Sequence, residues 1–265
     1  MKRILCSALV TLLPTVSVAF ESMDCLILPS REISLGATVP GLLAEVLVDR
    51  GDRVIAGQVV AQLRSDVQEA SLALAKSQAA NPAALKAAEA RLAFEEQELQ
   101  RAQDLLRRRV IAQQVMDERN TAYQIRLREL EEAQANAELA ALEVNLAESE
   151  LEIRRIRSPI DGVVTAREKD PGEYLRDDGS VLTIVQLNPL RVEVFLTQER
   201  YGAVAIGDEV EISSEAMPGK VMKARVELLD PIIDPSSATF GLRLSLQNPG
   251  ADILSGIRCR ARFDE

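Results

Sequence analysis

The sequence contains no histidine and no tryptophan, and its five methionines and three cysteines are scattered along the chain. Histidine is the commonest general base and the commonest metal ligand, so its absence removes the usual way to activate a serine or cysteine nucleophile. Scattered Met and Cys also argue against metal handling. No glycine-rich loop that could cradle a phosphate precedes a helix. We therefore expect no enzyme activity, no cofactor and no metal site.

Positive charge is in short supply. The chain has 31 Lys and Arg against 41 Asp and Glu, a net charge of −10. Nucleic-acid binding needs a basic face to meet the phosphates, so we expect no nucleic-acid partner.

Long hydrophobic runs are lacking too, apart from one stretch at the N-terminus. Lys2 and Arg3 precede apolar residues 4–18, and Ala19 ends a small-residue site for signal peptidase. We expect residues 1–19 to be a cleaved signal peptide. An uncleaved anchor is the alternative, which the short length of the stretch disfavours.

Two cysteines remain after cleavage at that site. Cys25 and Cys259 lie at opposite ends of the chain. In an oxidising compartment they could form a disulfide, since terminal strands often pair; two free thiols are the alternative. The sequence leaves both open.

Glycine is sparse, but five of the 13 glycines form a repeated pattern. Gly41 and Gly51 lie ten residues apart, as do Gly162 and Gly172, and Gly57 follows the first pair. Short β-branched runs between glycines are typical of strands, so we assign these five glycines to turns. Each half is too small to bury a core alone, so we expect the two halves to pack together.

The residues between the two halves have the composition of a helix. Residues 66–156 contain no glycine and are rich in Ala, Leu, Glu, Gln and Arg. The pattern is interrupted at Asn81-Pro82, a second helix start or a kink, and loosens at 107–112, the expected tip of an antiparallel coiled-coil hairpin. Two 3,4-spaced stripes predict arms of roughly 60 Å that pack together. The stripes are Leu85, Ala88, Leu92, Leu99, Ala102 and Leu106, interrupted by Glu95, and Leu130, Ala133, Ala137, Ala140, Val144, Ala147 and Leu151.

After Asn188-Pro189 the chain alternates apolar and polar residues in short runs separated by Pro-Gly and Asn-Pro-Gly turns. This pattern is typical of a small closed β-barrel, with a short helix expected within 198–205. The expected organisation is a signal peptide (1–19), an N-terminal strand segment (20–38), a first half-motif (39–64), a helical hairpin (65–157), a second half-motif (158–187) and a barrel (188–265).

Taken in order, these motifs resemble the membrane fusion protein, or periplasmic adaptor, family of tripartite efflux pumps. The resemblance covers nearly the whole chain after residue 19. It implies an elongated α+β fold, in which a lipoyl-like (barrel-sandwich hybrid) β domain is split by the hairpin and followed by a small β-barrel domain. The segments that carry it include Val39-Pro40-Gly41, Ser158-Pro159-Ile160-Asp161-Gly162, Asn188-Pro189-Leu190-Arg191-Val192 and Gly207-Asp208-Glu209-Val210.

In that family the hairpin tip contacts the outer-membrane channel through an Arg-x3-Leu-x6-Ser pattern. The matching residues are Arg101, Leu105 and Ala112, so the serine hydroxyl, worth about 0.5–1.5 kcal/mol as one hydrogen bond, is missing. With Arg108, these residues are the expected partner-binding tip. The alternatives are that the tip arginines only compensate the helix dipole, and that Leu105 only packs between the arms.

The resemblance implies a non-catalytic adaptor that joins an inner-membrane transporter to a TolC-type outer-membrane channel. An RND transporter is favoured, with an ABC transporter or type I secretion exporter as the alternative. One copy cannot enclose a conduit, so a homo-oligomeric ring is expected. The implied location is the periplasm, with association to the inner membrane through the transporter.

Two other functions fit less well. A lipoyl or biotinyl carrier needs an exposed lysine on the turn that joins the two halves, but the helical segment replaces that turn and Lys169 lies within the second half. A purely structural coiled coil would need neither the glycine half-motifs nor the barrel.

Overall fold

The computed structural model describes residues 22–176 and 178–263, so the expected signal peptide lies outside the described residues. The chain forms two compact units with separate hydrophobic cores. We call residues 22–32 with 185–263 the barrel unit, and residues 33–184 the split unit. Each is described by itself.

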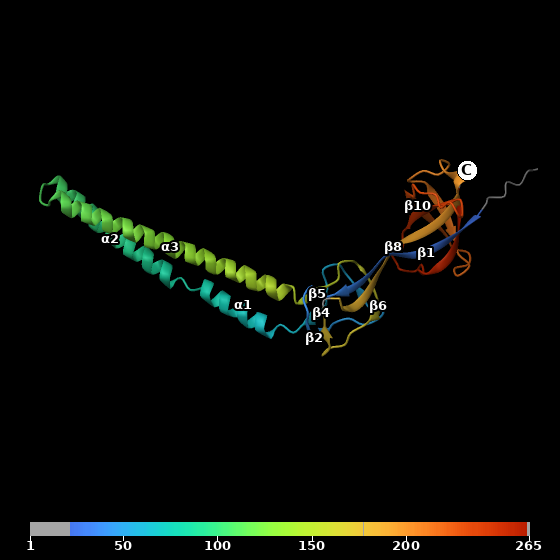
Figure 1. The fold of residues 1–265 in the computed structure, drawn as a ribbon, viewed down its shortest axis with the longest axis horizontal. Helices are drawn as coiled ribbons and strands as arrows, with labels where there is room; N and C mark the ends of the chain where they lie inside the picture. Colours follow the sequence, from blue (N-terminus) through green and yellow to red (C-terminus); the bar gives the residue numbers. More distant parts are fainter. Residues whose placement is uncertain (1–21, 177, 264–265) are drawn as a thin grey trace, which may run out of the picture. The chain divides into compact units, whose positions relative to one another are not determined.

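The barrel unit is a closed sheet (Figure 1). The strands are ordered β1-β12-β9-β10-β11-β8, and β8 pairs back with β1. Alternate side chains point inward, as the period-2 pattern predicts, and Val194, Ile212 and Phe240 are among the core residues. The 3-10 turn Gln198–Arg200 falls within the expected short helix. The strands are β1 (Ser22–Gly36), β8 (Ser180–Thr197), β9 (Glu209–Ser213), β10 (Val221–Leu229), β11 (Thr239–Leu246) and β12 (Ile257–Phe263).

The split unit joins the two glycine half-motifs in one body. β2 of the first half pairs with β7 of the second, and β3 pairs with β6. One core contains Leu43 and Leu63 from the first half and Val164 and Leu182 from the second. The prediction that the two halves share a core is confirmed. The strands are β2 (Gly41–Val46), β3 (Arg53–Val54), β4 (Val59–Leu63), β5 (Arg155–Arg157), β6 (Gly162–Arg167) and β7 (Tyr174–Leu175).

Three of the expected turn glycines adopt a left-handed backbone. Gly51, Gly57 and Gly172 have φ angles of 98°, 83° and 92°, which L side chains rarely adopt. Each donates its backbone N–H to a carbonyl oxygen of the opposite half at 2.8 Å. These turns therefore also hold the two halves together.

The prediction of a turn was wrong for the other two glycines. Gly41 and Gly162 are not turn residues; they begin strands β2 and β6. Gly41 is buried, and a Cβ there would lie 3.0 Å from an Nη atom of Arg154 and 3.2 Å from Cδ1 of Leu63. Close approach of these side chains, which the sequence spacing does not reveal, is the reason for glycine at position 41.

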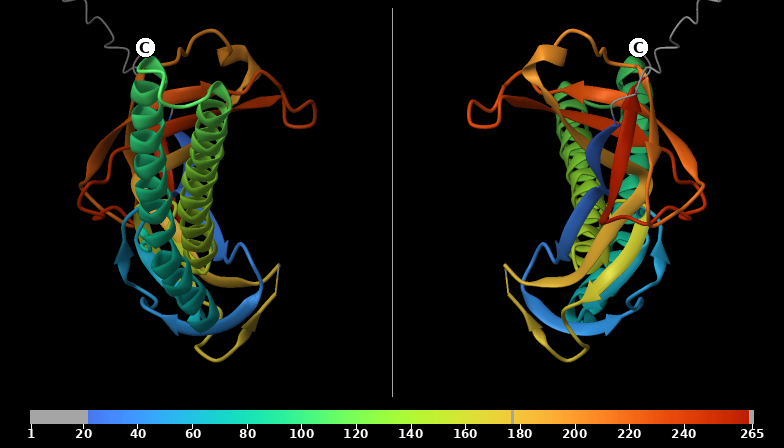
Figure 2. Two further views of the ribbon diagram at one scale, coloured as in Figure 1. Left: turned by 90° about the vertical axis from the view of Figure 1, so that its left-hand side faces the viewer. Right: turned by 90° about the vertical axis from the view of Figure 1, so that its right-hand side faces the viewer.

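Three helices occupy the segment between the halves: α1 (Asp66–Ala79), α2 (Ala83–Arg107) and α3 (Gln113–Glu152). Pro82 lacks the N–H that a continuous helix would need, and the Asn81 side chain accepts a hydrogen bond from the Ala83 N–H at the start of α2. We call α1 and α2 the first arm and α3 the second arm. The second arm runs back alongside the first and contacts both of its helices (Figures 1 and 2).

The contact between the arms is built on small residues. Ala75, Ala88 and Ala102 of the first arm and Ala147 of the second are buried. The leucines of both expected stripes are only half-buried, and Ala137 is exposed. An ion pair of 2.8 Å between Lys76 and Glu148 also joins the arms.

Both ends of the helical segment return to paired strands. β4 leads into α1, α3 leads into β5, and β4 pairs with β5 in antiparallel fashion, with Ala61 opposite Ile156. The two ends of the insertion therefore lie side by side, which is why a small β unit accommodates it.

Candidate functional site

The turn between α2 and α3, residues 108–112, is the tip of the arms. The Val110 N–H donates to the Leu105 carbonyl and the Arg109 N–H donates to the Leu106 carbonyl, both at 2.9 Å. This pair of bonds is the Schellman ending of a helix, which satisfies carbonyls left free by the last turn. The motif needs a left-handed residue, and Arg109 supplies it with φ 59°.

An arginine at that position is unusual. Glycine normally occupies it, because a Cβ in the left-handed region costs about 1–2 kcal/mol. Sequence reasoning missed Arg109 and Val110 as special positions. The one available signal was a helix that stops without a glycine or proline.

The basic side chains of this region differ in their partners. Arg101 pairs with Glu98, and Arg107 pairs with Asp104 in the last turn of α2. The side chains of Arg108 and Arg109 make no hydrogen bond or ion pair with any described residue. Both guanidinium groups lie at the helix C-terminus, where a positive charge is favoured. They are the two free cations that the tip presents.

Apolar side chains accompany them. Leu105 is 39% exposed and Val110 is 66% exposed. A hydrophobic contact between these two positions commonly accompanies the Schellman motif. Leu105 is therefore neither fully packed between the arms nor fully free.

Ala112 sits where α3 begins. It is the N-cap residue, in extended conformation, and it has no side-chain oxygen to accept a hydrogen bond from the first turn. Its own carbonyl accepts from the Val115 N–H at 3.1 Å. An alanine at this position thus leaves the start of α3 without a side-chain cap.

The four expected tip residues are not all neighbours. Leu105 belongs to the last turn of α2, Arg108 is the C-cap residue of that helix and Ala112 is the N-cap residue of α3. Arg101 lies one turn before Leu105 and is already paired. The structure places Leu105, Arg108 and Ala112 around one turn, together with Arg109 and Val110. Arg101 belongs to the flank.

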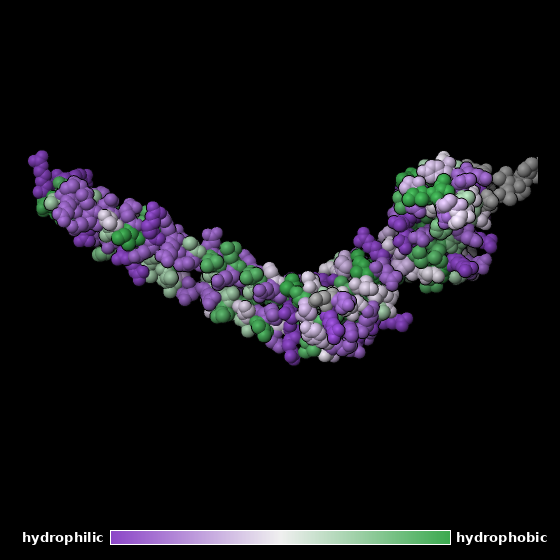
Figure 3. Space-filling view, in the orientation of Figure 1, coloured by the Kyte–Doolittle hydropathy of each residue, from purple (hydrophilic) through white to green (hydrophobic). Residues whose placement is uncertain are grey.

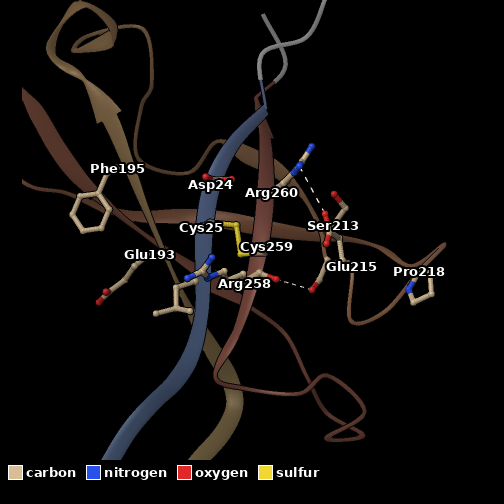
Figure 4. A pocket seen from close by; sticks show the side chains of 12 residues that line it. Asp24, Cys25, Glu193, Phe195, Ser213, Glu215, Pro218, Arg258, Cys259 and Arg260 are labelled. Carbon is tan, nitrogen blue, oxygen red and sulfur yellow. Dashed lines mark hydrogen bonds and ion pairs between the residues drawn. A yellow bond between two sulfur atoms is a disulfide. The ribbon is translucent and has the colours of Figure 1, made fainter.

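A pocket of about 860 Å³ lies on the barrel unit beside Cys25 and Cys259 (Figure 4). These cysteines are directly opposite residues of β1 and β12, with Cα atoms 4.8 Å apart, and a disulfide joins them. Arg260 pairs with Glu215 at 3.8 Å on the rim. The lining mixes charges of both signs, and none of the expected partner-binding residues belongs to it.

Two features are absent from the residues that the structure describes. No group of three or more His, Cys, Asp or Glu side chains is placed to hold a metal ion among them. Within the same residues, no helix has the length and apolar character to cross a membrane.

Comparison with known proteins identifies the architecture. Residues 31–186, more than half of the chain, match the CzcB-like barrel-sandwich hybrid domain, and residues 190–265 match the CusB-like β-barrel domain. The chain belongs to the membrane fusion, or periplasmic adaptor, proteins. The split unit is thus the barrel-sandwich hybrid domain of an adaptor.

Relatives of this adaptor are distant in sequence. It is 25% identical over 239 residues to an uncharacterized protein of Haemophilus influenzae, covering 90% of this chain and 56% of that protein. It is 24% identical over 235 residues to the nodulation protein NolF of Rhizobium meliloti, covering 83% of this chain and 56% of that protein. The adaptor therefore spans little more than half the length of these two relatives.

Solved structures share the fold. MacA from Actinobacillus actinomycetemcomitans superimposes with a TM-score of 0.75 at 20% identity, covering 92% of this chain and 78% of that one. The membrane fusion protein Spr0693 from Streptococcus pneumoniae gives a TM-score of 0.63 at 17% identity, covering 92% and 99%.

Proposed function

We propose that this adaptor is a non-catalytic periplasmic subunit that links an inner-membrane efflux transporter to a TolC-type outer-membrane channel. The observation that carries the proposal is the insertion of two helical arms between the paired strands β4 and β5 of one β unit. The arms end in a short turn, residues 108–112, which is remote along the chain from both β4 and β5. Such a turn suits contact with a separate protein better than it suits chemistry.

In this proposal the arms form an antiparallel coiled-coil hairpin, and its tip is the contact with the channel. Arg108 and Arg109 offer unpaired charges and Leu105 and Val110 offer apolar surface, the combination that protein interfaces favour. Arg101 and Ala112 flank this contact. Several copies stand in a ring, because one copy cannot enclose a conduit.

The transporter is proposed to be of the RND class. The barrel, residues 190–265, matches a CusB-like β-barrel domain family whose short name carries that class name. An ABC-type or type I secretion exporter is the second candidate, and the fold shared with MacA is compatible with either. The proposed location is the periplasm, after removal of residues 1–19.

The proposal is tested by photo-crosslinking in cells. A photoreactive amino acid is placed at Arg108 or Ala112, and the crosslinked proteins are identified by mass spectrometry. The matched control carries the same amino acid at Gln134, which is exposed in the middle of the second arm. We expect an outer-membrane channel protein to be captured from the two tip positions and not from Gln134.

Capture of the channel from Gln134 as efficiently as from the tip would contradict the proposed tip contact. Failure of all three positions to capture any envelope protein would contradict the adaptor function itself.

A further inference from the structure

The outer surface of the barrel unit has hydrophobic patches between hydrophilic ones (Figure 3). A second pocket of this unit, about 640 Å³ in volume, lies between β8 and the loop that joins β10 to β11. A pocket of that size suits a small molecule. Eight described residues line it, and none of them is Lys or Arg. The pocket beside Cys25 and Cys259 differs, because charges of both signs line it and favour no ligand of one charge.

Gly241 leaves this second pocket open. It lies inside β11, directly opposite Phe195 of β8, and its φ angle is not in the left-handed region that would require glycine. A glycine within a strand weakens the strand and often marks a place where another group approaches closely. A Cβ at Gly241 would overlap Oδ2 of Asp230 and would lie 3.7 Å from Cε1 of Phe195. The missing side chain therefore leaves room for a carboxylate and an aromatic ring at one place.

The carboxylate of Asp230 is held in place but has no partner. The backbone N–H of Asp230 donates to the Gly241 carbonyl at 2.9 Å, which fixes the residue beside β11. The side chain of Asp230 makes no hydrogen bond or ion pair with any described residue. With no basic residue in the lining, its negative charge is not neutralised within the pocket.

The second aspartate of the pocket, Asp234, is already occupied. It accepts hydrogen bonds from the hydroxyl and the backbone N–H of Ser236. These two bonds, that of the hydroxyl above all, hold the pKa of the Asp234 carboxyl below its ordinary value of 3.8. Asp234 therefore adds a second negative charge at neutral pH, and Asp230 is the carboxylate that is open to a ligand.

Apolar side chains beside these charges face water. Phe195 is 62% exposed and Ile232 is 78% exposed. The face of an aromatic ring attracts cations, and it does so more strongly where water is excluded. A carboxylate, an aromatic ring and an aliphatic side chain together match a ligand that is both positively charged and apolar.

We propose that this pocket binds a small organic cation with an apolar body, such as an aromatic ammonium compound. The cationic group is bound by Asp230 and by the ring of Phe195, and the apolar body packs on Ile232. This binding site goes beyond the proposed function, which depends on the arms and their tip.

The proposal is tested with benzyltrimethylammonium, titrated into the full chain without residues 1–19 and followed by ¹H–¹⁵N NMR. We expect the amide signals of residues 195, 230, 239 and 241 to shift, with a dissociation constant on the order of 0.1–1 mM for a ligand of this size. Benzyl sulfonate has the same ring and a negative charge, so we expect it not to bind.

Substitutions separate the contributions of charge and ring. Asp230→Asn keeps the shape and the backbone hydrogen bond and should weaken binding about two- to fivefold at low ionic strength, the usual effect of an exposed ion pair. Phe195→Leu should weaken binding by about the same factor. Gly241→Ala should abolish binding by filling the pocket. Asp252→Asn is the matched control, because Asp252 is an exposed aspartate of the same unit that does not line the pocket.

The proposal would be overturned if the cation shifted none of these signals, or if benzyl sulfonate bound equally well. An unchanged affinity in Asp230→Asn, or an equal loss in Asp252→Asn, would overturn it as well. The measurement uses the isolated protein and alters no residue of the tip. A negative result therefore leaves the proposed contact with the channel intact, and failure of that contact leaves this site intact.

Discussion

Arg109 and Ala112 are unfavourable residue types for the backbone positions that they occupy. Arg109 holds a left-handed conformation at the end of α2 that glycine would adopt at less cost. Ala112 begins α3 without a capping oxygen. Both lie in the turn that we propose as the contact with the channel. Strained or uncapped residues persist where another requirement outweighs stability, and partner binding is such a requirement.

Replacing Ala112 by serine should stabilise the start of α3. A serine Oγ at the N-cap accepts a hydrogen bond from an N–H of the first turn, which is worth about 0.5–2 kcal/mol. We expect slower hydrogen exchange of the amides of residues 113–115, measured by NMR or mass spectrometry. Ala112→Val, which adds bulk but no oxygen, is the control. Equal protection in both variants would show that capping is not the cause.

At the scale of elements, the junction where α3 becomes β5 is held by charge. Glu152 accepts a hydrogen bond of 2.6 Å from Nε of Arg157 and one of 3.3 Å from Arg155. The bond from Arg157 is the largest cause of a pKa of the Glu152 carboxyl below its ordinary value of 4.5. These bonds tie the last turn of the second arm to the strand that pairs with β4.

This junction should weaken in acid. Because folding lowers the pKa of Glu152, its contribution to stability is present above pH 4.5 and is lost as the pH falls through the lowered pKa. Glu152→Gln should therefore lower the midpoint of thermal unfolding slightly at pH 7, and the difference from the wild-type protein should shrink as the pH falls below 4.5. The measurement is circular dichroism at 222 nm between pH 3 and 7. A substitution effect of the same size at both pH values would refute the role of the ionised carboxylate.

At the scale of the molecule, the chain builds two cores from segments that alternate along its length. The barrel unit takes its first strand from the N-terminal part of β1 and its remaining strands from beyond residue 185. The disulfide between Cys25 and Cys259 bridges 234 residues and closes this unit. The split unit has its own core and no cysteine among its described residues.

The disulfide should therefore stabilise one unit only. We expect the Cys25→Ala, Cys259→Ala double variant to lower the unfolding free energy of the barrel unit by about 2–4 kcal/mol, the usual effect of a native disulfide. Differential scanning calorimetry would follow both units, and reductant should shift wild-type protein in the same direction without affecting the double variant. A shift of the split unit by the same amount would contradict this.

Some of this organisation could be predicted because its signals are local. Helical composition without glycine predicted the segment that became α1, α2 and α3, with the break at Pro82. Alternating runs predicted the barrel strands, and the repeated ten-residue glycine spacing predicted two halves of one core. Of the tip, sequence located the turn, placed Arg108 and Ala112 in it and Leu105 next to it, but Arg101 proved to be a paired residue on its flank.

The features that sequence did not reveal depend on contacts between distant residues. The residues near Gly41 in the sequence do not show that Arg154 and Leu63 will approach it. For this reason Gly41 was predicted to lie in a turn, whereas it begins β2. The periodicity of the second stripe also does not show that Ala137, one of its members, is exposed. A stripe shows which side of a helix is apolar, but whether its side chains are buried depends on the element that packs against that side.

By itself, then, the sequence determined what depends on neighbours along the chain: the kinds of element, their order, and the left-handed turns at glycine. Only the tertiary structure decided the opposition of Cys25 and Cys259, the joining of β4 to β5, and which apolar side chains of the arms stay in water. The reason is physical. Backbone preference and periodicity act over a few residues, whereas register and burial are set when segments more than a hundred residues apart come into contact.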